Sequence, residues 1–166
     1  MRRARDSINP RTHPDIMVLS GEDRGNLDLH PYWYARVLGI YHAEVRHDRP
    51  NAVSSDIQVL EFLWVRWFGQ DADYNAGSTG HHLYRVGFVP DDPIDLNDPT
   101  QVSGAFGFID PAEVIRGIHL IPAFAYGKTD GLLGPSIARP LQDNDHDWQY
   151  FYVNMYLIIF LLRYSI

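Results

Sequence analysis

The sequence predicts a mainly β fold, a small and distorted antiparallel β-barrel with one short helix and long loops. Short runs rich in β-branched and aromatic residues alternate with runs rich in glycine, proline and aspartate, as strands alternate with loops. Only residues 110–115 have the pattern of a helical start. The chain has no internal repeat and no heptad pattern, so we expect one irregular β domain.

The predicted central strand spans residues 57–68, because this densest run of β-branched and aromatic residues is apolar on both faces. A second long strand is predicted at residues 32–46, joined to the first as a hairpin by the loop 47–56. Gly39 inside that strand predicts a bulge. One face of the second strand is expected to meet the core, and it carries Trp33, Ala35, Val37, Gly39, Tyr41, Ala43 and Val45.

The remaining elements are short. Strands are predicted at residues 15–19, 83–89 and 118–123, a brief strand or ordered loop at 102–109, and a last ordered run at 148–162. Asp110 is the predicted N-cap of a helical turn that ends at Gly117, with Pro111 at its first position and Glu113 three residues after the cap. Residues 70–80, 91–100 and 126–147 are predicted loops.

Length and composition indicate one globular domain within the 166 residues. The formal net charge of −7 disfavours binding to a nucleic-acid backbone and favours a basic peptide or protein partner. The absence of cysteine excludes disulfides, thiolate zinc sites and a cysteine nucleophile. No segment has the features of a secretory signal or the length of a membrane span, so we expect an intracellular protein.

The two ends differ from the predicted module at residues 12–156. Residues 1–11 contain four arginines and little apolar content, which predicts a basic disordered arm or, alternatively, an arm for localisation or phosphate contact. Residues 157–166 form an apolar tail that is either a truncated or mis-spliced reading frame or the completion of the core.

Aromatic side chains supply the strongest binding hypothesis, because two to four aromatic faces can enclose a cation such as methyl-lysine. Most of the aromatic residues must nevertheless fill the core. The best predicted binding rim consists of Trp148 and Tyr150, which follow an acidic loop, and the full set of predicted binding residues is Trp148, Tyr150, Asp143, Asp145, Asp147, Trp67 and Tyr34.

No cofactor and no metal site is predicted. Asp143, Asp145 and Asp147 resemble the start of a calcium loop, but Trp148 and Asn154 stand where glycine and glutamate are required, so they are interpreted as solvated loop acids. The adjacent His81 and His82 would point to opposite faces of a strand and could not chelate together there. No catalytic residue is predicted either.

Three blocks, at residues 32–41, 64–69 and 108–122, resemble a domain toward the C-terminal side of basidiomycete fungal transposase-like proteins of the Plavaka and KDZ groups. The resemblance covers residues 11–155 and implies an accessory module without assigned activity. The chain is also distantly similar to the bromo-adjacent homology (BAH) domain, a distorted β-barrel used for protein contacts in chromatin. It lacks that family's arginine-proline pair after Trp67 and Phe68, where Gly69 and Gln70 stand.

These resemblances imply a non-catalytic, transposon-derived interaction module in the nucleus that binds basic chromatin peptides. The alternative is an accessory domain that contacts transposon DNA or the transposase. The DNA version predicts one basic face, formed by Arg36, Arg46, Arg66, Arg85 and Arg116. A third alternative, a metal-dependent hydrolase, would use His81 and His82.

Overall fold

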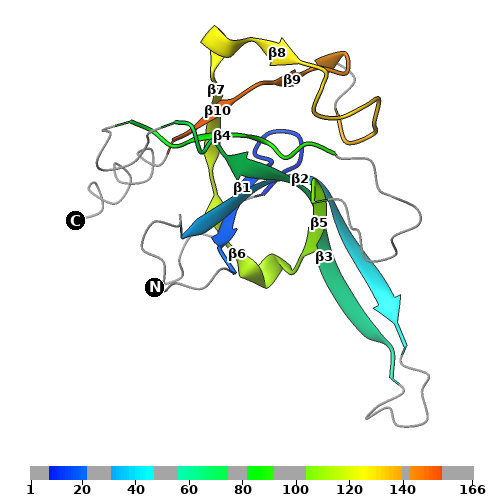
Figure 1. The fold of residues 1–166 in the computed structure, drawn as a ribbon. Helices are drawn as coiled ribbons and strands as arrows, with labels where there is room; N and C mark the ends of the chain where they lie inside the picture. Colours follow the sequence, from blue (N-terminus) through cyan, green and yellow to red (C-terminus); the bar gives the residue numbers. More distant parts are fainter. Residues whose placement is uncertain are drawn as a thin grey trace, which may run out of the picture.

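The computed structural model describes residues 8–21, 31–46, 56–74, 82–91, 104–139 and 143–154. Within these ranges the chain is mainly β and antiparallel, as predicted (Figure 1). An eight-stranded sheet has the order β6-β1-β2-β3-β4-β10-β7, with β5 paired to β3 beside that path, and β8 and β9 form a separate two-stranded sheet. No closed barrel is found among the described residues, so the barrel stays a prediction.

The predicted strands are largely confirmed. The sheet consists of β1 (Asp15–Leu19), β2 (Tyr32–Val45), β3 (Gln58–Gln70), β4 (Arg85–Phe88), β5 (Phe106–Ile109), β6 (Val114–Gly117), β7 (His119–Pro122) and β10 (Phe151–Asn154). The small second sheet consists of β8 (Lys128–Thr129) and β9 (Asp147–Trp148). The range 126–147 was predicted as loop alone, and this is wrong because it holds β8 and the start of β9.

The helical turn is confirmed, but it is shorter than predicted. A single 3₁₀ turn, η1 (Pro111–Glu113), begins after Asp110, whose carboxylate accepts a hydrogen bond from the Ala112 N–H at 2.8 Å. The residues that follow form β6 rather than a continued turn, because Val114 and Arg116 pair with β1. A second 3₁₀ turn, η2 (Phe124–Tyr126), leads into β8.

The central strands carry a hydrophobic core on each face, as their two-sided apolar pattern predicts. One core comprises Met17, Tyr34, Phe68, Val86, Phe88, Leu120, Phe151 and Val153. The other comprises Ile16, Val18, Ala35, Val37, Leu63, Val65 and Ile109. Alternate residues of β1, β2 and β3 therefore point into different cores.

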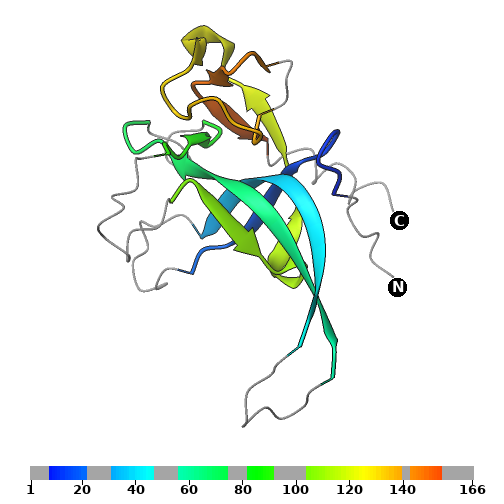
Figure 2. The same ribbon diagram turned by 90° about the vertical axis from the view of Figure 1, so that its right-hand side faces the viewer.

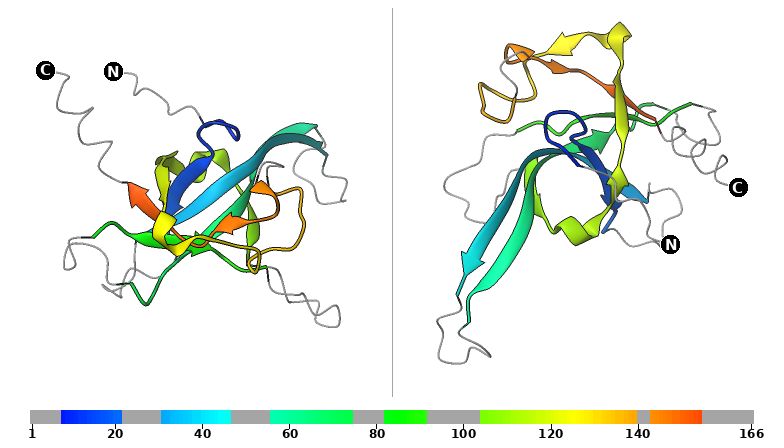
Figure 3. Two further views of the ribbon diagram at one scale, coloured as in Figure 1. Left: turned by 90° about the horizontal axis from the view of Figure 1, so that it is seen from above. Right: turned by 180° about the vertical axis from the view of Figure 1, so that it is seen from behind.

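The hairpin of β2 and β3 extends beyond these cores as a long arm (Figures 2 and 3). The predicted bulge is confirmed, because the register between the two strands shifts between Val37 and Gly39. The expectation that one whole face of β2 meets the core is wrong. Ala35 and Val37 are buried, whereas Tyr41 and Val45 are 47% and 42% exposed, because the bulge after Val37 turns Tyr41 and Val45 to the opposite face of the sheet, on the part of the hairpin beyond the end of β1.

The predicted arm at residues 1–11 is ordered in its described part. Ile8 packs against the second core, and Asn9 and His13 form an isolated bridge. Residues 1–7 and the apolar tail at 157–166 lie outside the described residues.

Candidate functional site: an aromatic pocket between two diverging strands

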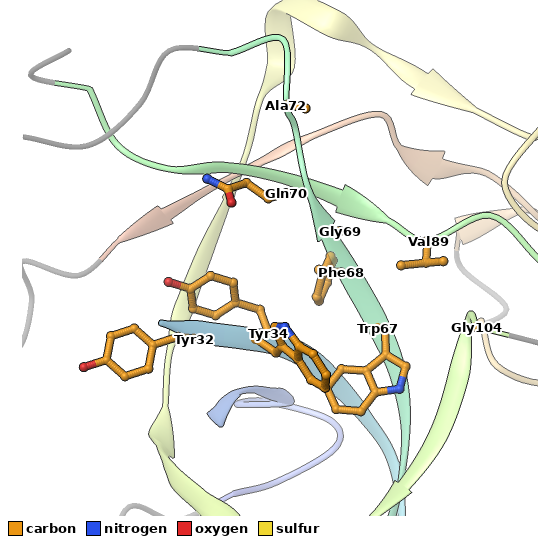
Figure 4. Close-up of a pocket in the computed structure, with 10 residues that line it drawn as sticks. Tyr32, Tyr34, Trp67, Phe68, Gly69, Gln70, Ala72, Val89 and Gly104 are labelled. Atoms are coloured by element: carbon orange, nitrogen blue, oxygen red, sulfur yellow. The ribbon is translucent and has the colours of Figure 1, made fainter. Parts of the chain in front are cut away.

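A pocket of about 520 Å³ opens where β2 and β3 stop pairing with each other (Figure 4). Their shared ladder ends at Tyr34 and Phe68. The first residues of β2 pair with β1, beginning with Tyr32 opposite Leu19. The last residues of β3, Gly69 and Gln70, pair instead with β4. The two strands diverge, and the pocket occupies the space between their ends.

Aromatic rings dominate the pocket lining, which comprises Tyr32, Trp33, Tyr34, Trp67, Phe68, Gly69, Gln70, Ala72, Val89 and Gly104. The Trp33 and Trp67 rings meet edge to face, with centroids 5.8 Å apart and an interplanar angle of 78°. Trp33 is 41% exposed, and Tyr32 and Trp67 are partly buried. A ligand side chain entering this pocket would therefore meet accessible aromatic surface from two strands.

The position of Trp67 is fixed from three sides. Its backbone N–H donates to the Ala105 carbonyl at 2.8 Å, and its carbonyl accepts from the Val89 N–H at 3.0 Å. Its indole lies against Gly107, where an added Cβ atom would stand 2.6 Å from Trp67 Nε1. Glycine at position 107 therefore allows the close approach that places the ring beside Trp33.

Tyr34 and Phe68 form the buried part of the pocket lining, at 2% and 6% exposure. Burial raises the pKa of the Tyr34 phenol, so it is neutral at physiological pH. Tyr34, one of the predicted binding residues, lines the pocket, but most of its side chain packs in the first core.

The predicted rim residues Trp148 and Tyr150 already face cations of the same chain. Lys128 Nζ lies 5.3 Å from the Trp148 ring centroid, and the Arg85 guanidinium carbon lies 4.6 Å from that of Tyr150. Arg85 is also held by Asp71 at 2.6 Å. The Arg85 contact is buried, so Tyr150 has a structural role in the fold.

The three predicted loop acids do not form one exposed rim. Asp145 is exposed and lies 3.9 Å from Arg139, and Asp143 is partly buried. Asp147 is 6% exposed and binds two arginines, so its interpretation as a solvated loop acid is wrong. The sequence carried no signal for this role, because Asp147 and Arg66 are 81 residues apart.

Asp147 anchors the small β8–β9 sheet to the central strand β3. Arg66 binds it bidentately, with Nη1–Oδ1 and Nη2–Oδ2 distances of 2.9 Å, and Arg139 Nη2 donates to Oδ2 at 2.8 Å. Burial alone would raise the pKa of Asp147, but the hydrogen bonds from Arg139 and Arg66 outweigh it and hold the pKa below its usual range. The Arg66 guanidinium also lies 3.9 Å from the Phe88 ring centroid.

Three of the five arginines predicted to form a basic face for DNA are paired with carboxylates inside the fold. Arg36 pairs with Asp15 at 2.7 Å, Arg66 with Asp147, and Arg85 with Asp71. These charges are neutralised within the fold. Among the described residues, no group of three or more histidine, aspartate or glutamate side chains is arranged to hold a metal ion. His82 is exposed, and His81 lies outside the described residues.

Of the aromatic residues that line the pocket, the predicted binding set includes Trp67 and Tyr34 and leaves out Tyr32 and Trp33. The divergence of β2 from β3 creates the pocket. In the sequence, only Gly69, which follows the last shared pair, indicates where the two strands stop pairing. Comparison with known proteins gives no further guidance, because no family model, no curated protein and no solved structure matches the chain. No helix within the described ranges is long and apolar enough to cross a membrane.

Proposed function

We propose that the chain is a non-catalytic interaction module that binds a cationic side chain of a basic peptide in the aromatic pocket between β2 and β3. The edge-to-face pair of Trp33 and Trp67 in an open pocket is the observation that supports this proposal. Aromatic faces attract ammonium and guanidinium groups through their quadrupoles. The net charge of −7 would draw a basic partner toward the domain.

A methylated lysine is the ligand that fits this pocket best. Methyl groups spread the charge and add apolar surface, which suits a lining made mainly of aromatic and aliphatic groups. Among the lining side chains, the Tyr32 and Tyr34 hydroxyls, the Trp33 and Trp67 indoles and the Gln70 amide supply polar atoms, and none is a carboxylate. An unmodified ammonium would therefore lose its hydration without gaining a carboxylate partner, and should bind more weakly.

The experiment is a fluorescence titration of the full chain with histone-tail peptides that are identical except for lysine methylation. Trp33→Ala is expected to weaken methylated-peptide binding by about 2- to 30-fold, the range equivalent to one cation–π contact. Trp148→Ala is the matched control, since this tryptophan faces Lys128 outside the pocket, and it should leave the affinity unchanged. Equal affinity of the wild-type chain for methylated and unmodified peptides would contradict the proposal.

The two alternatives have less support. A DNA-contacting role requires a basic surface, and Arg36, Arg66 and Arg85 are each paired with a carboxylate. A metal-dependent hydrolase requires converging ligands, which the described residues lack. The origin in a fungal transposon protein and the nuclear location remain proposals that rest on the sequence resemblance.

The distorted barrel belongs to the same proposal. The sheet path begins with β6 and ends with β7, and only Ile118 separates these strands in the chain. The Ile118 N–H donates to the Asp15 carbonyl at 2.9 Å, so bonding to β1 continues to the residue before His119, where pairing with β10 begins. We propose that β6 and β7 act as one bent strand that closes the sheet into the barrel implied by the BAH resemblance.

A further inference from the structure

The outer part of the β2–β3 hairpin has one uncharged face that runs onto β5. Strand register places Tyr41 opposite Phe62, Ala43 opposite Leu60 and Trp64 opposite Phe108, so their side chains share a side of the sheet. We call this surface the aromatic face, and it consists of Tyr41, Ala43, Val45, Gln58, Leu60, Phe62, Trp64, Phe106 and Phe108.

The rings of the aromatic face form a nearly continuous strip. Tyr41 stacks on Phe62 with centroids 5.7 Å apart, and Phe62 meets the Phe108 ring edge to face at 5.5 Å. Trp64 stacks on Phe106 at 6.1 Å. These contacts orient the side chains against each other and leave their outer surfaces accessible.

Much of this apolar surface is exposed. Phe108 is 71% exposed, Leu60 54% and Tyr41 47%. Together with its partly buried members, the aromatic face presents roughly 600 Å² of mostly apolar surface, which is at or above the largest patch of a typical monomer. A projecting two-stranded ribbon is also marginally stable in water, so cover on this face would stabilise it.

Within the paired segments 39–45 and 58–64 of the hairpin, the charged residues lie on the opposite face. His42 lies opposite Glu61, and Glu44 lies opposite Val59. The aromatic face offers no carboxylate to a basic peptide and no cation to a nucleic acid. Its chemistry is matched by another uncharged, aromatic surface of similar size.

We propose that the aromatic face is the interface of a homodimer, in which two copies pack hairpin against hairpin about a two-fold axis. A two-fold interface brings the same patch of each copy together, so an uncharged face meets an uncharged face. Two such faces would bury roughly 1,200 Å² in total, at the lower end of stable interfaces. Glu44 and Glu61 would remain on the outer side of each hairpin, away from the interface. This arrangement limits the electrostatic repulsion between two chains that each carry a net charge of −7.

The test is sedimentation velocity of the full chain over a dilution series. The wild type is expected to sediment as a concentration-dependent dimer. Phe108→Asp and Leu60→Asp should each weaken dimerisation by about 100-fold or more, because a symmetric interface contains every substitution twice. Ile137→Asp is the matched control, since Ile137 is 91% exposed and lies outside the aromatic face, and it should dimerise like the wild type.

Raising the salt concentration should strengthen the dimer, because salt screens the repulsion between two acidic chains and favours apolar burial. Far-UV circular dichroism checks that each variant is folded, which is expected since the substituted side chains lie outside both cores. A monomeric wild type at all concentrations would overturn the proposal. Association that persists in both Phe108→Asp and Leu60→Asp would also overturn it, because it would then arise from another part of the chain.

Discussion

Asp147→Asn is expected to destabilise the fold far more than its position in a polar loop would indicate. Among the residues that the structure describes, Asp147 is the only carboxylate within bonding distance of Arg66, whose side chain is 1% exposed. It is also the closer of the two carboxylates that contact Arg139, whose side chain is 2% exposed. Removing one partner of a buried ion pair typically costs about 3–5 kcal/mol, because the remaining charge is buried without compensation. That cost is a large part of the roughly 5–15 kcal/mol that stabilises a domain.

The assay is urea unfolding of the full chain followed by circular dichroism, which gives the free energy of unfolding and its dependence on urea. Asp145→Asn is the matched control in the same loop. Asp145 is largely exposed and 3.9 Å from Arg139, and asparagine tolerates its positive φ of 57°, so this variant should lose less than about 1 kcal/mol. Equal losses in the two variants would refute the reasoning, since they would show that Asp147 does not compensate buried charge.

Three further outcomes are expected. Below about pH 4 the wild type should lose stability more steeply than Asp147→Asn. The depressed pKa of Asp147 stabilises the fold at pH values above the unfolded-state carboxyl pKa of about 3.9, and this stabilisation is lost as the pH falls through the folded-state pKa. Parallel acid-unfolding curves would contradict this prediction. Gly107→Val should displace the Trp67 indole and weaken peptide binding in a fluorescence titration. Gly134→Val, at a glycine with open space around it, should leave the peptide affinity unchanged. Asp15→Asn should cost less than Asp147→Asn in urea unfolding, because the Arg36 side chain is 24% exposed and water can solvate it.

The long strands were predictable because the local sequence pattern marks their position. Alternation of apolar residues located β2 and β3, Gly39 marked the bulge, and Asp110 with Pro111 marked the 3₁₀ turn. These features depend on neighbours within a few residues, which a single sequence contains.

The pairing of distant residues was not predictable in this way. The apolar alternation of β2 continues to Val45, but the bulge after Val37 moves its later members to the other face of the sheet, where Tyr41 and Val45 stay exposed. Periodicity alone predicts neither this change of face nor whether another element covers a face. For the same reason the aspartates of one loop could not be separated into the buried Asp147 and the exposed Asp145.

The pocket illustrates the same limit. Aromatic residues were predicted to bind a cation, and Trp67, which lines the pocket, was among those selected. The choice of Trp148 and Tyr150 as the rim rested on their nearness in sequence to acidic residues. In the fold, Lys128 and Arg85 face those two rings, and the open aromatic surface lies at Trp33 and Trp67.

The most direct test of the proposed binding function is an NMR spectrum of the four tryptophan indole N–H groups during titration with a methyl-lysine peptide. Each tryptophan reports a different place: Trp33 and Trp67 the pocket, Trp148 the ring facing Lys128, and Trp64 the aromatic face. Saturable shifts of the Trp33 and Trp67 signals, with Trp64 and Trp148 unmoved, are the predicted result. Shifts confined to Trp148, or no shift at any of the four, would contradict a binding role for the pocket.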